Sequence, residues 1–159
     1  MGVCAVAMNQ QDTALLQAQA RRFRAVIEQL DKCLLPLSFE AFPRGSCGDA
    51  ALLLGTYLSE LGFGEFTYVC GQCRDSKGPD KLASHAWLVS ADGTIVDITA
   101  DQFPDVTEPV IVSKSSEWHA RWETTSNSRA DYRGYDGPSM HSLDAAYRLI
   151  KSALDTSHP

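Results

Sequence analysis

The 159-residue sequence has little positive charge, no long hydrophobic run and no regular set of cysteines. Its formal net charge is -6 at pH 7. A protein that binds nucleic acid by neutralising phosphates needs clustered lysine and arginine, so we expect no nucleic-acid partner. The basic cluster Arg21-Arg22-Phe23-Arg24 lies in a helical pattern, and we expect it to form a solvated helix face.

No stretch approaches the roughly 20 apolar residues of a membrane-spanning helix. The first eight residues lack the charged leader and apolar run of a secretory signal. We therefore expect a cytoplasmic protein with no membrane partner, unless a specialised export system takes it. An odd number of cysteines at scattered spacings indicates free thiols in a reducing compartment. These are Cys4, Cys33, Cys47, Cys70 and Cys73.

A hydrophobic content of 44% is sufficient for one domain with a real core, and we treat residues 1–159 as a single domain. Apolar residues recur three or four apart over residues 12–35, which predicts an N-terminal amphipathic helix. Good helix formers over residues 49–61, with Gly62 as a C-terminal cap, predict a second helix that begins beside Cys47. A closing amphipathic helix is expected over residues 143–154.

Strand patterns follow the second helix, within a catalytic core expected over residues 37–112. Strands are expected over residues 65–71, 84–90, 94–99 and 109–112. Helices followed by a run of strands predict an α+β fold, with N-terminal helices packed on an antiparallel sheet. Specificity is expected from a loop over residues 74–81 and from residues 113–140, which show no clear period. The spacing of Trp118 and Trp122 favours a place in the core.

The sequence around Cys47 suits a thiol nucleophile. A thiol attacks as the thiolate, so its pKa must be lowered by a helix N-terminus or a nearby imidazolium. Gly45-Ser46-Cys47-Gly48 lets the chain turn into the second helix, whose unpaired N–H groups would then lie beside the sulfur and hold an oxyanion. A buried cysteine that only fills space is the alternative.

His85 and Asp97 each lie in an apolar strand pattern, where a polar side chain needs a partner. His85 precedes the apolar residues 86–89, and Asp97 lies between Val96 and Ile98. Neighbouring strands would pair the two side chains and complete a nucleophile, base and orienting carboxylate. A structural histidine is the alternative. Three other histidines lie in polar or terminal stretches and are expected at the surface: His119, His141 and His158.

The loop between these two strands decides whether His85 and Asp97 can meet. Side chains alternate between the faces of a strand, and directly opposed residues share a face. A two-residue turn would place His85 and Asp97 on opposite faces. A three-residue loop over residues 91–93, closed by Gly93 with a positive φ, would pair Trp87 with Asp97 and put His85 on the same face. The triad hypothesis therefore predicts the three-residue loop.

Together these segments resemble the core of the transglutaminase-like thiol enzymes of the papain-like superfamily. The resemblance covers about residues 39–103. It rests on Gly45-Ser46-Cys47-Gly48, Leu61-Gly62-Phe63, Tyr68-Val69-Cys70-Gly71, Ser84-His85-Ala86-Trp87 and Ile95-Val96-Asp97-Ile98-Thr99. It implies a papain-like core with Cys47 as nucleophile, His85 as base and Asp97 as orienting carboxylate.

The resemblance implies an acyl-transfer enzyme that acts on a protein or peptide substrate through an acyl-thioester intermediate. We expect an amide hydrolase, either a peptidase or a protein-glutamine deamidase. Two alternatives are an acyltransferase, since arylamine N-acetyltransferases share the triad order, and an inactive binding or adaptor protein.

Two features of the sequence bear on what else the site contains. Papain-like proteases place a glutamine a few residues before the cysteine as an oxyanion donor, but residues 37–46 contain none, so the second donor is unassigned. Cys70-Gly71-Gln72-Cys73 lacks the second ligand pair of a structural zinc site. We expect no metal and no cofactor.

Overall fold

The computed structural model describes residues 7–74 and 82–157 of the chain. Within these ranges the helices are α1 (Gln10–Gln29), α2 (Cys47–Glu60), α3 (Glu117–Ala120) and α4 (Pro138–Thr156), and the strands are β1 (Phe66–Arg74), β2 (Leu82–Ser90), β3 (Ile95–Asp97), β4 (Ile111–Ser113) and β5 (Glu123–Arg129). Short 3-10 turns are η1 (Lys32–Leu34), η2 (Leu37–Phe39), η3 (Ala100–Gln102) and η4 (Tyr132–Gly134). Most of the expected loop over residues 74–81 lies outside the described residues, as do Cys4 and His158.

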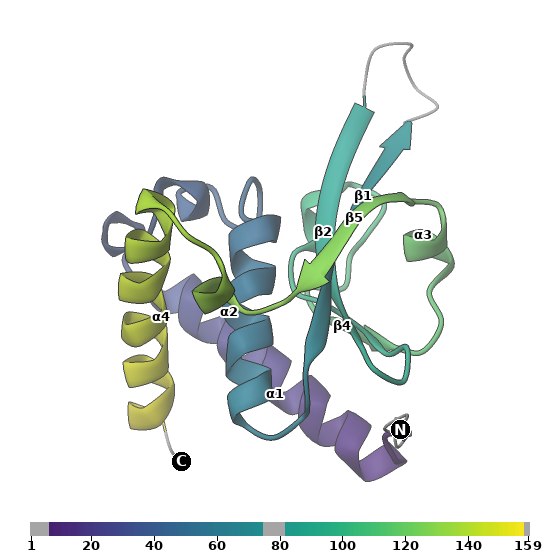
Figure 1. The fold of residues 1–159 in the computed structure, drawn as a ribbon, viewed down its shortest axis with the longest axis horizontal. Helices are drawn as coiled ribbons and strands as arrows, with labels where there is room; N and C mark the ends of the chain where they lie inside the picture. Colours follow the sequence, from purple (N-terminus) through teal and green to yellow (C-terminus); the bar gives the residue numbers. More distant parts are fainter. Residues whose placement is uncertain (1–6, 75–81, 158–159) are drawn as a thin grey trace.

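The strands form a five-stranded antiparallel sheet in the order β4-β3-β2-β1-β5. In Figure 1, α1, α2 and α4 gather on one side of the sheet and α3 lies on the other. The main hydrophobic core fills the side of the three long helices. A smaller cluster around Val69, Trp87 and Trp122 fills the α3 side, where Trp118 packs against it. The prediction of an α+β fold with helices packed on an antiparallel sheet is confirmed.

The first helix is shorter than the sequence predicts. It ends at Gln29 rather than near residue 35, because Leu30 adopts an extended conformation with ψ 145°. The Asp31 side chain then accepts a hydrogen bond from the Cys33 N–H and caps the turn η1. Leu34, which continues the apolar spacing of the helix, is 62% exposed. The local cap at Asp31 therefore overrides the periodicity.

The second helix begins at Cys47 and ends at Glu60, and Gly62 has a positive φ of 91°, as the sequence predicts. Residues 50–58 are all buried, because α2 packs between the sheet and the other two long helices. The helix approaches the segment after β5 so closely that a Cβ on Gly55 would lie 2.5 Å from the carbonyl oxygen of Ala130. The middle of α2 is thereby held close to the segment that follows β5.

Residues 113–140, for which the sequence supports no assignment, contain α3, β5, η4 and the start of α4. All seven residues of β5 are exposed, so this strand has no apolar alternation and is held by its backbone pairing with β1. Helix α4 begins five residues earlier than expected, with Pro138 in its first turn. Among the described residues, no helix is both long and apolar enough to cross a membrane.

The sequence predicts that the basic cluster Arg21-Arg22-Phe23-Arg24 is a solvated helix face. This prediction is wrong for Arg24, which is buried. Arg24 is 6% exposed, and its guanidinium donates to both carboxylate oxygens of Asp101, at 2.6 and 2.8 Å. It also donates to the carbonyl oxygens of Ile98 and Pro109. Since a buried charge needs such compensation, Arg24 ties α1 to the segment that follows β3.

Candidate active site

Strands β2 and β3 are joined by the three-residue loop that the triad hypothesis predicts. The register pairs Leu88 with Val96, and Gly93 has a φ of +86°. His85 and Asp97 consequently lie on one face of the sheet. Their side chains meet in a hydrogen bond of 2.6 Å from His85 Nε2 to Asp97 Oδ2. The predicted loop, glycine conformation and contact are all confirmed.

The Asp97 carboxylate is 2% exposed and is hydrogen-bonded on both oxygens. Oδ2 accepts from His85 Nε2 and, at 2.9 Å, from His119 Nε2. Oδ1 accepts from the Thr99 N–H at 2.9 Å and from its hydroxyl at 3.3 Å. Burial raises the pKa of Asp97, but the hydrogen bonds from His119 and His85 outweigh burial and hold this pKa well below its usual range. The carboxylate is therefore ionised throughout the neutral range.

His119 is a member of this cluster that the sequence analysis missed. It is 4% exposed rather than at the surface, because α3 folds back over the sheet and turns the imidazole toward Asp97. Its Nδ1 lies 2.7 Å from the Ser116 hydroxyl, which also caps α3. With the proton on Nε2, His119 donates to Asp97 and accepts from Ser116. One feature of the sequence could have indicated that His119 is buried, namely its position between Trp118 and Trp122. In the structure both tryptophans pack against His85.

Cys47 is half-buried at the first residue of α2 and is hydrogen-bonded to His85. Backbone N–H groups of Ala86 and Gly48 also donate to its sulfur. Burial is the largest single influence and raises the pKa of Cys47. The contacts with His85 and the two N–H groups together outweigh burial and lower this pKa below its ordinary value.

His85 is 1% exposed and connects the thiol to the carboxylate. Burial lowers the pKa of His85, but the hydrogen bonds with Asp97 and Cys47 outweigh burial and raise it to about 9. Because Nε2 donates to Asp97, Nδ1 is the nitrogen that forms the hydrogen bond with Cys47. Each shift favours the charged form of its group, the thiolate of Cys47 and the imidazolium of His85.

Aromatic rings enclose His85 on the side away from α2. The ring centroids of Trp87, Phe103, Trp118 and Trp122 lie 5.2 to 5.8 Å from that of the imidazole. These rings keep water from the hydrogen bond between His85 and the carboxylate, which strengthens it. The two tryptophans of the segment after β4 thus pack in a core, as expected, and this core surrounds the candidate base.

Gln102 is a second residue that the sequence analysis missed. Its Nε2 donates to the Thr99 carbonyl at 3.0 Å and lies 3.3 Å from His85 Nδ1. The turn η3 directly after β3 positions this amide beside the nitrogen that serves Cys47. No pattern in the sequence marks Gln102, because its place depends on how the chain turns after Asp97.

His85, Asp97 and His119 could also hold a metal ion, since their donor atoms lie within 4.8 Å of one another. Both histidines, however, direct a ring nitrogen at the same carboxylate oxygen at hydrogen-bonding distance, and a metal would displace these protons. Cys70 and Cys73 are three apart on β1, so their side chains point to opposite faces and do not form half of a zinc site.

The cluster therefore combines a thiol of lowered pKa, a buried imidazole of raised pKa and an ionised carboxylate. These are the groups needed for nucleophilic attack and proton transfer at one carbon. Comparison of the chain with family models, with curated proteins and with solved structures gave no match.

Proposed function

We propose that this chain is an amide hydrolase with a transglutaminase-like core of the papain-like superfamily. Cys47 is its nucleophile, His85 its general base and acid, and Asp97 the carboxylate that orients His85. The observation that carries this proposal is that His85 is hydrogen-bonded to Cys47 on one side and to Asp97 on the other. The position of Cys47 at the start of α2, packed on the sheet that holds His85 and Asp97, supports the resemblance in fold.

In the first half of the reaction, the Cys47 thiolate attacks the carbonyl carbon of a peptide bond or of a glutamine side-chain amide. A carbon–sulfur bond forms, and the carbonyl electron pair moves to the oxygen. This oxyanion accepts a hydrogen bond from the backbone N–H of Cys47, which has no intrahelical acceptor. His85 then gives its Nδ1 proton to the nitrogen, the carbon–nitrogen bond breaks, and an amine or ammonia leaves.

In the second half, His85 Nδ1 removes a proton from water as the water oxygen attacks the thioester. The tetrahedral intermediate expels the Cys47 thiolate and releases a carboxylic acid. Throughout both halves Asp97 holds the Nε2 proton of His85, so that Nδ1 keeps facing the thiol. His119 and Thr99 in turn hold the carboxylate.

Alkylation of Cys47 tests the proposal without a known substrate. With limiting iodoacetamide at pH 7, Cys47 is expected to react at least about 10-fold faster than the exposed Cys33, because an ordinary thiol is only a few per cent ionised there. In His85→Ala the rate at Cys47 is expected to fall by about 10-fold or more, since burial of the sulfur is no longer opposed by the imidazole. Peptide mass spectrometry after quenching gives the rate at each cysteine.

His141 provides a matched control, because it is exposed and lies in α4, outside the cluster. His141→Ala is expected to leave the alkylation of Cys47 unchanged. Equal rates at Cys47 and Cys33 in the unchanged protein would favour an inactive adaptor over an enzyme.

A further inference from the structure

A pocket of about 870 Å³ opens beside the proposed active site. One wall is formed by residues 41–44, which lead into the N-terminus of α2, and the other by residues 101–104, which follow β3. The first segment ends three positions before Cys47, and the second begins four positions after Asp97. Gln102 lines the pocket and also lies 3.3 Å from His85 Nδ1. A group bound in this pocket would therefore lie next to the carbonyl that Cys47 attacks.

The pocket combines aromatic surface with one uncompensated charge. Phe42 and Phe103, both half-buried, provide aromatic surface. Asp101 is the acidic residue of the lining, and Arg24 engages both of its carboxylate oxygens. Arg44 is exposed and forms no ion pair or side-chain hydrogen bond with a described residue. The lining therefore carries one unpaired positive charge in a protein whose net charge is -6.

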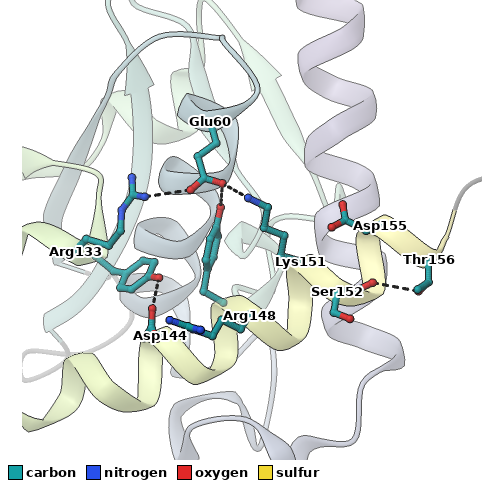
Figure 2. A pocket seen from close by; sticks show the side chains of 10 residues that line it. Glu60, Arg133, Asp144, Arg148, Lys151, Ser152, Asp155 and Thr156 are labelled. Atoms are coloured by element: carbon teal, nitrogen blue, oxygen red, sulfur yellow. Dashed lines mark hydrogen bonds and ion pairs between the residues drawn. The ribbon is translucent and has the colours of Figure 1, made fainter.

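A second pocket, of about 610 Å³, lies between α4, η4 and the end of α2 (Figure 2). It differs from the first pocket in how its positive charges are compensated. Its cations are paired: Arg133 and Lys151 with Glu60, and Arg148 with Asp144. The pair of Lys151 with Glu60 joins α4 to α2, and the pair of Arg133 with Glu60 joins η4 to α2. The pair of Arg148 with Asp144 lies within α4. Arg44 has no such structural task, so its guanidinium is available to a ligand.

We propose that the pocket over residues 41–44 and 101–104 binds the part of the substrate next to the scissile amide. It selects a segment that combines an aromatic or apolar group with a carboxylate, the latter held by Arg44. A guanidinium binds a carboxylate through two parallel hydrogen bonds, which supplies both orientation and charge complementarity. This inference rests on the proposed function, because it takes Cys47 as the reacting group.

Two alkylating probes that differ in one group test the proposal. N-iodoacetyl-phenylalanine carries an aromatic ring and a carboxylate, and N-iodoacetyl-phenylalaninamide carries the ring with a neutral amide. In each case the Cys47 thiolate displaces iodide and forms a thioether. The rate constant for the acid is expected to exceed that for the amide by about five-fold, the scale of a partly exposed ion pair.

In Arg44→Gln this ratio is expected to fall to about one, and in Arg44→Lys to an intermediate value. The ratio cancels any general change in the reactivity of Cys47. Arg148→Gln, in the second pocket, is the matched control and should retain the ratio of the unchanged protein. A ratio near one in the unchanged protein, or the same ratio in Arg44→Gln, would overturn the proposal. Slow alkylation of Cys47 by plain iodoacetamide would instead contradict the proposed function.

Discussion

Replacing Cys47 with alanine is expected to lower turnover of an amide substrate by at least about 10³-fold, because the acyl-thioester can no longer form. The free energy of unfolding is expected to change by no more than about 1 kcal/mol, since a half-buried thiol adds little packing. Turnover is measured as ammonia or amine released from a panel of glutamine-containing proteins and peptides. Stability is measured by chemical denaturation.

Cys33→Ala is the matched control for this variant, because Cys33 is exposed in the turn η1 and remote in sequence from the catalytic segments. It is expected to leave turnover unchanged. If Cys47→Ala failed to fold, Cys47 would be a core residue rather than a nucleophile. Turnover retained in a folded Cys47→Ala protein would remove it from the mechanism.

Asp97→Ala is expected to cause the largest loss of stability, about 3–5 kcal/mol. The change leaves two buried imidazoles, His85 and His119, without the oxygen to which both donate. Asp97→Asn keeps the shape of the side chain but replaces one oxygen by a donor. One of the N–H groups facing the carboxylate then loses its acceptor, which costs about 1–3 kcal/mol.

The catalytic effect of Asp97→Asn is expected to exceed its effect on stability. Turnover should fall by about 10³- to 10⁴-fold, with little change in the concentration of substrate that gives half-maximal rate, because His85 is held in the wrong tautomer. Asp144→Asn changes a carboxylate remote from the site, one that accepts from Tyr132 and Arg148, and serves as the control. Unchanged turnover in Asp97→Asn would show that Asp97 does not orient the base.

Features that depend on near neighbours in the chain could be predicted from the sequence. The start of α2 at Cys47 follows from the glycines that flank it and from the helix formers beyond. The contact of His85 with Asp97 follows from side-chain alternation and from Gly93, which closes the loop with a positive φ. Both predictions used only the geometry of one element or one hairpin.

Features that depend on how distant segments fold together could not be predicted. His119 and Gln102 reach His85 only because α3 and η3 turn back over the sheet, and neither segment has a hydrophobic period. Strand β5 has exposed side chains on both faces, so its sequence shows no strand pattern, and only its backbone pairing with β1 identifies it as a strand. Arg24 resembles the solvated residues beside it in sequence, but a carboxylate 77 positions later compensates its charge. In each case the missing information was the identity of a spatial neighbour.

The pH dependence of Cys47 alkylation by iodoacetamide tests the central claim most directly, because it reports ionisation of the thiol in the presence of His85. A depressed thiol pKa means that the thiolate is lost only when the pH falls below that pKa. The raised pKa of His85, about 9, means that the imidazolium is lost only as the pH rises through that value. The account predicts that the alkylation rate rises to a plateau below about pH 8.5, the ordinary range of a thiol. The rate then changes again near pH 9, where the His85 imidazolium loses its proton. In His85→Ala the rise should move to higher pH. A single rise at or above about pH 8.5, the same in both proteins, would contradict the account.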